Sequence, residues 1–332
     1  MEQLEITTQS ALQVINNTRF DLPPEERNQK PFIVANTINS SFDEMKAHHI
    51  IPVFTKDNEP LISHTDFIDT MVDITKDVFH GEHIFKPQIR VSHPIKGRVP
   101  DAKDKPASQL LESEKTLYYE RMMFAIELPS IQDKIDGNTL SLTVGGVKAY
   151  NLDNLYSRSL CDQHFKVFIG FKNSVCANLC VWTDGLMENL CVKNISQLTA
   201  SIRTLLESYN KNFHLFQLKK FSEHNISEQQ FANLIGRCRM YQHLPGELKT
   251  EIPAILFGDQ QLGAVVKDFY KDSSFCRSEN GQINLWRLYN LFTGTNKSSY
   301  IDSFLERSVN AFSLVEQIRH ALEEKETCWY LS

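Results

Sequence analysis

The chain has 332 residues, of which 41% are apolar and 23% are charged, proportions close to those of ordinary globular proteins. Its formal net charge of −6 argues against a protein that coats nucleic acid or anionic membrane by bulk charge, so any basic surface has to be local. No run of about 18 apolar residues exists, and none of the helices expected here should cross a membrane. Seven scattered cysteines and an acidic N-terminus without an apolar signal stretch favour a cytoplasmic protein.

Three stretches of the chain differ in their patterning. Residues 1–30 are polar, carry Pro23 and Pro24 among charges, and lack a sustained period, which predicts a flexible arm. Residues 31–192 are predicted to form a sheet region, and residues 193–332 a helical region packed against it. Because strands and helices do not alternate throughout, the expected fold class is α+β with a mainly antiparallel sheet.

The first clear element is a helix that follows a short predicted strand at 50–54 and a turn at 56–58. Ser63 stands where an N-cap belongs, Asp66 lies three residues later, and Gly81 is expected to end the helix. Three carboxylates share the polar face, namely Asp69, Asp73 and Asp77. A solvated helix face is the favoured interpretation of this stripe, and a divalent-metal site is the alternative.

Residues 86–106 hold four prolines and mostly basic charges, so they cannot form a helix. The first part is predicted as an edge strand and the remainder as a long, exposed basic loop. The bases on this loop that could contact phosphates are Lys96, Arg98, Lys103 and Lys105.

Residues 121–192 are predicted to supply three or four antiparallel strands, separated by turns such as Asp136-Gly137. Gly145 and Gly146 are expected to form a turn or bulge. Beyond residue 194 the period becomes helical, with one long helix from about residue 196 to 221 and a second that begins at a Ser227/Gln230 capping box. The segments 283–294 and 298–325 are predicted to close the fold as a helical pair.

The end of the long predicted helix interleaves cations with aromatic rings. Such a surface suits phosphates and stacked bases, and its lysines are Lys211, Lys219 and Lys220. Helical spacing also places Tyr209, Phe213 and Phe216 on one face, where rings are more often part of a core. The core interpretation of these rings is the favoured one.

Other chemistry-bearing patterns are weaker. Four residues offer zinc-type ligands, namely Cys161, His164, Cys176 and Cys180. A strand that contained both Cys176 and Cys180 would separate these two cysteines by about 13 Å, too far for one zinc ion. We therefore expect no metal, and we expect the pairs His48/His49 and His80/His83 to serve at the surface. Because the common phosphate-loop, dinucleotide and hydrolase motifs do not occur, no cofactor and no catalytic residue are expected.

The run LWRLYNLFT at 285–293, followed by Glu306-Arg307, resembles the closing signature of phage/plasmid-like families of unknown function found on mobile elements. Upstream, two strands that end in Cys176-x-Asn178 are similar to the same families, and the resemblance covers residues 120–325. Leu179 stands where a glycine would be expected, which does not favour a tight turn there.

The resemblance implies phage, plasmid or integrative-element biology and transfers no catalytic residue. Its signature residues are Trp286, Tyr289, Asn290 and Arg307. Packing and helix capping are the favoured roles of the first three.

From these observations we expect a non-catalytic accessory protein that binds nucleic acid, with single-stranded DNA favoured, through the loop and helix bases named above. The alternative is an interaction module that binds a host or phage protein through the helical region. A divalent-metal nuclease built on the aspartate stripe is the least favoured hypothesis, because such chemistry needs carboxylates that converge in a cavity.

Overall fold

The computed structural model describes residues 30–48, 61–151 and 163–332. Nearly all of the predicted arm, the strand predicted at 50–54 and its turn lie outside these residues. Residues Phe32–Ser332 form one compact unit.

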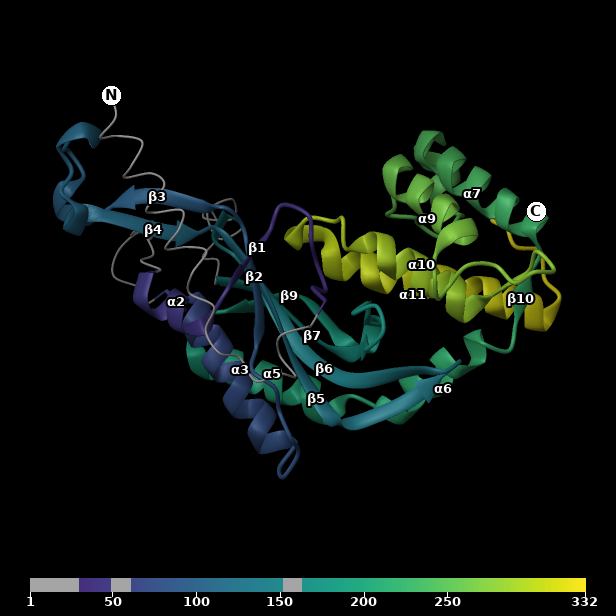
Figure 1. The fold of residues 1–332 in the computed structure, drawn as a ribbon, viewed down its shortest axis with the longest axis horizontal. Helices are drawn as coiled ribbons and strands as arrows, with labels where there is room; N and C mark the ends of the chain where they lie inside the picture. The colour runs from purple at the N-terminus through teal and green to yellow at the C-terminus, as the bar shows by residue number, and fades with distance from the viewer. Residues whose placement is uncertain (1–29, 49–60, 152–162) are drawn as a thin grey trace. The chain divides into compact units, whose positions relative to one another are not determined.

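An antiparallel sheet lies at the centre of this unit (Figure 1). Its strands, in spatial order, are β1 (Ile38–Ser40), β2 (Gln88–Val91), β5 (Arg121–Ile135), β6 (Asn138–Ala149), β7 (Gln163–Asn173) and β8 (Leu179–Cys180), with β9 (Leu186–Val192) also on β7. Strands β5 and β6 are joined at Asp136-Gly137, whose positive φ angles of 48° and 77° suit a two-residue hairpin turn. The predicted α+β class with a mainly antiparallel sheet is confirmed.

Helices cover both faces of the sheet. Helices α3 (His64–Val78) and α5 (Ile195–Ser208) pack on one face, where the ring of Phe124 in β5 lies 5.1 Å from that of Phe67 in α3. The neighbouring Met123 and Ala125 point to the other face and join the apolar cluster of Phe304 and its neighbours in α11 (Ile301–Glu324). This alternation follows from the two-residue period of a strand.

The predicted start of α3 is confirmed. The Ser63 hydroxyl accepts a hydrogen bond from the Asp66 backbone N–H, and the Asp66 carboxylate accepts one from the Ser63 backbone N–H. Gly81 follows the helix end with a φ of 83°, close to the predicted position.

Gly145 and Gly146 form no turn or bulge, so that prediction is wrong. Both lie in regular pairing within β6, between β5 and β7. A Cβ on Gly146 would lie 2.3 Å from the Phe67 ring, and one on Gly145 would lie 2.1 Å from the Phe124 carbonyl oxygen. The glycines are there because α3 and the neighbouring strand approach the sheet closely.

The proline-rich segment forms a hairpin instead of a long loop. Strand β3 (Pro94–Arg98) pairs with β4 (Lys115–Tyr119), and three short 3-10 turns, η1 (Pro100–Ala102), η2 (Ala107–Gln109) and η3 (Glu112–Glu114), connect them. We call residues 94–119 the hairpin arm. The predicted strand is present as β2, but its predicted edge position is wrong, because β1 pairs with the outer side of β2.

The single long helix predicted from about residue 196 is in fact two helices, α5 and α6 (Lys211–Phe221). Asn210 accepts a hydrogen bond from the Phe213 backbone and starts α6 as its N-cap. Asparagine is a strong N-cap and a weak helix former, so the chain begins a new helix at this point.

The rest of the helical region contains α7 (Glu228–His243), α8 (Gly246–Lys249), α9 (Asp259–Lys271) and α10 (Leu285–Asn296), with α2 (Phe42–His48) near the start of the chain and a short β10 (Asn225–Ile226)/β11 (Ile283–Asn284) pair. The predicted capping box of Ser227 and Gln230 and the closing pair α10/α11 are confirmed. One apolar cluster runs from Met45 through the sheet to Tyr330. Across the described ranges, no helix combines the length and apolarity that a membrane crossing needs.

Candidate nucleic-acid interface

Helix α6 carries exposed aromatic rings together with lysines. Phe213 and Phe216 are 44% and 53% exposed. Lys220 Nζ lies 4.9 Å from the centroid of the Phe216 ring, and Lys211 in the first turn is exposed. The core interpretation of these two rings is therefore wrong. We call Lys211, Phe213, Phe216, Lys219 and Lys220 the α6 surface.

The break at Asn210 explains why these rings face outward. Leu215, Leu218 and Phe221 occupy the buried side of α6. Phe213 and Phe216 then fall on the opposite side, as the helical period requires. In a helix continuous with α5 the same rings would have continued its buried stripe, which is the pattern that the sequence presented.

His214 anchors α6 to the sheet. Its ring stacks on Trp182 at 5.3 Å between centroids and lies 5.5 Å from Phe171 of β7, and its Nδ1 shares a hydrogen bond with the Tyr209 hydroxyl. Burial lowers the pKa of His214 to about 3, so the ring is neutral. The exposed rings of α6 thus stand on a firmly packed helix.

The lysines of the α6 surface differ in how they are held. Lys219 Nζ lies 2.7 Å from Asp133 Oδ2 of β5 in an ion pair. Lys220 is poised over Phe216, where a cation is attracted to the ring face. Lys219 is therefore less available to a phosphate than Lys211 or Lys220.

The bases of the hairpin arm are partly engaged within the arm itself. Arg98 donates hydrogen bonds to the carbonyl oxygens of Lys103 and Lys105. The hydrogen bond from Lys105 holds the pKa of Glu114 below its ordinary value. Lys96 and Lys103 have exposed side chains.

The two basic groups do not form one patch. The hairpin arm adjoins the start of β5 at Arg121, whereas Lys219 contacts Asp133 near the end of the same strand. The intervening strand spans roughly 30 to 40 Å at 3.3 Å per residue. Figure 1 shows the two segments at different ends of the sheet.

The aspartate stripe of α3 is an exposed face with cationic neighbours. Asp69 lies 3.2 Å from Lys46, and Asp77 lies 2.9 Å from Arg203. The side chains of Asp69, Asp73 and Asp77 are 50%, 79% and 65% exposed. Within the described residues, no group of three or more His, Cys, Asp or Glu side chains converges as metal ligands would.

The four zinc-type residues are also separated in their local structure. Cys161 lies outside the described residues, and His164 Nδ1 is 3.1 Å from Cys191 Sγ. Cys176 lies in a turn before β8, whereas Cys180 is buried in that strand, so the predicted continuous strand through both is wrong. His80 and His83 are exposed, while His49 and the side chain of His48 are not described.

The signature residues connect the sheet to α10. Trp286 and Tyr289 are fully buried, which confirms the packing interpretation. Asn290 bridges two segments instead of capping a helix, because its Oδ1 accepts hydrogen bonds from Asn173 Nδ2 (3.2 Å) and Asn178 Nδ2 (3.3 Å). An asparagine inside an apolar helical stripe was the sequence signal for this buried contact.

Arg307, the last signature residue, fastens α11 to the segment before α9. Its Nε donates to the Leu256 carbonyl oxygen at 2.9 Å, and its Nη1 donates to Ser299 Oγ at 2.9 Å. Burial lowers the pKa of its guanidinium from the ordinary value. The residue therefore has a structural role in this region.

A tight turn does form before Asn178, contrary to expectation. The Ala177 backbone donates to the Asn173 carbonyl oxygen at 2.7 Å, and Ala177 has a φ of 57°. The left-handed residue is thus the one before the asparagine, so a glycine after it is not needed. This geometry brings Asn173 and Asn178 to the same side, where they meet Asn290.

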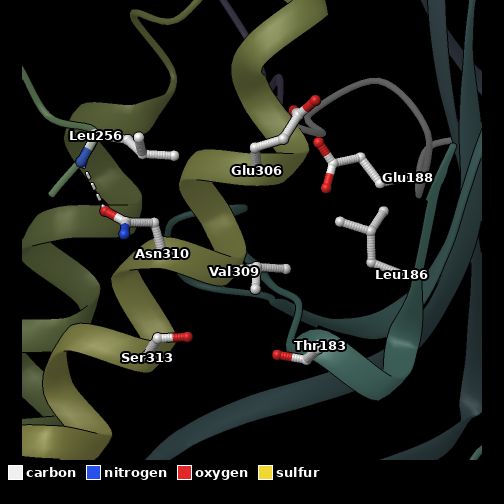
Figure 2. Close-up of a pocket in the computed structure, with 8 residues that line it drawn as sticks. All are labelled: Thr183, Leu186, Glu188, Leu256, Glu306, Val309, Asn310 and Ser313. Atoms are coloured by element: carbon white, nitrogen blue, oxygen red, sulfur yellow. Dashed lines mark hydrogen bonds between the residues drawn. The ribbon is translucent and has the colours of Figure 1, made fainter. Parts of the chain in front are cut away.

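A pocket of about 340 Å³ lies between α11 and the β9 side of the sheet (Figure 2). Leu186, Leu256 and Val309 give it apolar walls, and Glu188 and Glu306 add two carboxylates. Lys166 forms an ion pair with Glu306, which leaves Glu188 as the carboxylate that would repel a phosphate, so this pocket is a poor place for a nucleic-acid backbone. The α6 surface is the better candidate.

Comparison with known proteins gives one match. The family described as "Domain of unknown function, B. Theta Gene description (DUF3871)" matches residues 10–331. Neither the curated proteins nor the solved structures include a match to this chain.

Proposed function

Since the chain belongs to the DUF3871 family, whose description names no activity, we propose from its surface that it is a non-catalytic protein that binds single-stranded nucleic acid. The observation that carries this proposal is the exposure of Phe213 and Phe216 beside lysines on a firmly anchored helix. Single-strand binding proteins combine such rings, on which bases stack, with cations that follow the backbone. Phe213 also contacts Trp182, with ring centroids 5.4 Å apart, and still leaves 44% of its surface exposed.

Single-stranded DNA is the favoured ligand, and a cytoplasmic accessory role in a phage, plasmid or integrative element is the favoured setting. The support for this setting is the resemblance of residues 285–293 and of the Cys-x-Asn turn to phage/plasmid-like families. The acidic remainder of the chain limits non-specific binding and leaves the local surface to act.

The test is the binding of a fluorescent oligo-dT, measured by anisotropy at several salt concentrations. Each lost phosphate contact should flatten the dependence of log K on log salt by about 0.7 for a single strand. Because Lys219 is held by Asp133, the variant Lys211/Lys219/Lys220→Ala should flatten the slope by about 1.4, as if two contacts were lost.

The variant Phe213/Phe216→Ala should behave differently. Loss of stacking should weaken binding by about 1 to 3 kcal/mol per base while leaving the salt slope unchanged, because rings carry no charge. Lys267→Ala with Lys271→Ala on α9 is the matched control, since it removes two exposed lysines elsewhere, and it should bind like the unchanged protein. A variant of Lys96, Arg98, Lys103 and Lys105 to Ala measures the separate contribution of the hairpin arm.

A second candidate is an interaction module that binds a host or phage protein. The observation that favours it is the half-apolar pocket along α11, where Leu256 is 44% exposed (Figure 2). This second function replaces the first if the protein does not bind oligo-dT at low salt. It also replaces the first if the affinity for oligo-dT changes neither with salt concentration nor in the α6 variants.

A further inference from the structure

A second pocket opens where the turn at 173–178 meets α10 and the end of α9. Its volume is about 210 Å³. The side chains that matter for its chemistry are Cys176, Asn178, Asp268, Asp272, Phe275 and Leu291. None of these residues belongs to the α6 surface, so a ligand here would be independent of the proposed nucleic-acid binding.

Asn178, which lines this pocket, carries a buried hydrogen-bond acceptor. The residue is 2% exposed, and its Nδ2 donates to the Asn290 carbonyl oxygen at 3.0 Å and to Asn290 Oδ1 at 3.3 Å. Because both partners are acceptors, the amide orientation is fixed and Oδ1 must point away from them. Among the described residues, this buried Oδ1 has no hydrogen-bond partner. Buried acceptors are nearly always paired, so a donor is missing.

Two carboxylates stand one helical turn apart on the same pocket wall. Asp268 and Asp272 are at positions i and i+4 of the α9 end. Asp272 Oδ1 accepts hydrogen bonds from the backbone of Ser274 (2.8 Å) and Phe275 (2.7 Å), and within the described part of the chain its other oxygen is left for a ligand. Burial, followed by the nearby Asp272 carboxylate, raises the pKa of Asp268 above its ordinary value. Lys297 also lines the pocket, and its Nζ donates to the Cys176 carbonyl oxygen, which holds the ammonium group without neutralising it. Two carboxylates against one ammonium group leave the lining with a net negative charge, which favours a cation.

Apolar side chains complete the wall. Phe275 and Leu291 are each 3% exposed and line the same pocket. We propose that this pocket binds an alkyl ammonium or alkyl guanidinium group, which donates to Asn178 Oδ1 and to the aspartates while its carbon chain lies against Phe275 and Leu291. A bare metal ion fits less well, because the space exceeds the roughly 30 Å³ that one water occupies.

The half-buried Cys176 thiol allows the pocket to be probed directly. The full chain is treated with iodoacetamide, and the rate of alkylation is followed at each cysteine by peptide mass spectrometry. Butylguanidinium is the probe, with butyramide and butyrate as neutral and anionic analogues of similar length. The exposed Cys191 serves as the internal control.

Butylguanidinium at about ten times its Kd should slow alkylation of Cys176 about tenfold, because only the empty pocket reacts. A Kd on the order of 1 mM is expected for so small a ligand. Alkylation of Cys191 should not change. Asp268→Asn should remove the protection, whereas Asp259→Asn at the far end of the same helix should retain it.

Two further ligands identify the source of the cation in the same alkylation experiment. Protection by agmatine points to a free amine metabolite, and protection by N-acetyl-arginine methylamide points to a side chain of a partner peptide. Equal slowing by butyramide, or no slowing of Cys176 by any cation, would overturn the proposal. These measurements use the unchanged chain, so they test the proposed cation binding even if the Asp268 variant folds poorly.

Discussion

At the scale of single residues, three neutral polar side chains join the sheet to the helices. Asn173, Asn178 and Asn290 are each at least 98% buried, and the Nδ2 groups of Asn173 and Asn178 both donate to Asn290. Their hydrogen bonds connect the end of β7 to α10, two segments more than 110 residues apart. Such buried networks fix one arrangement of the elements, because any other leaves polar groups without partners.

His214 gives a prediction for the pH dependence of stability. Its pKa is about 3 in the folded protein and about 6.5 in the unfolded chain, so below pH 6.5 the unfolded chain binds a proton that the folded protein excludes. The free energy of unfolding should fall by about 1.4 kcal/mol per pH unit between pH 6.5 and 3 from this group. Between pH 7 and 4.5, His214 alone should lower the free energy of unfolding by about 2 to 3 kcal/mol.

In the variant His214→Gln, the free energy of unfolding should no longer show this fall of about 2 to 3 kcal/mol between pH 7 and 4.5, although the variant is also less stable at pH 7. The measurement is urea unfolding at both pH values, and the quantity compared is the difference between them. His320→Gln on the exposed side of α11 is the control and should keep the difference of the unchanged protein. An unchanged difference in His214→Gln would show that the pKa of His214 is the same in the folded and the unfolded chain.

At the scale of helices and strands, glycines allow neighbouring elements to approach each other closely. Gly146→Ala should lower the free energy of unfolding by about 3 kcal/mol or more, because the new methyl group meets the Phe67 ring and the Lys166 carbonyl oxygen. Gly263→Ala, in the middle of α9 with open space around it, should instead raise it by about 0.4 to 1 kcal/mol. Denaturant unfolding of both variants checks the pair, and a stable Gly146→Ala protein would mean that α3 can move away from the sheet.

Sequence patterns predicted the elements whose signals are local. Capping boxes at Ser63 and Ser227 and the turn at Asp136-Gly137 depend on neighbouring residues alone, and all three are present. The outward turn of Phe213 and Phe216 was missed, because only the cap at Asn210 and the packing of His214 decide which side of α6 faces the core. The Asn178 pocket was missed as well, since it needs contacts between segments far apart in sequence.

At the scale of the whole molecule, one apolar cluster links the sheet with the helical region. Residues 32–332 should therefore unfold in a single transition, because neither region keeps a complete core without the other. Hydrogen exchange measured by mass spectrometry across a urea series tests this. Strands β5 to β7 and helices α10 and α11 should lose protection at the same urea concentration, and two separated transitions would contradict the prediction.

The packing of Phe32 and Ile33 with Phe304 and Leu305 has a consequence for biosynthesis. The backbone of Val34 and Ala35 also donates to the Lys297 carbonyl oxygen, so this early segment finds its partners only after α10 and α11 have been translated. At about 5 to 20 residues per second the wait is on the order of ten to fifty seconds. During that time the sheet face of Met123, Ala125 and Phe168 lacks its helical cover, and a chaperone that binds apolar strands would find it on the ribosome.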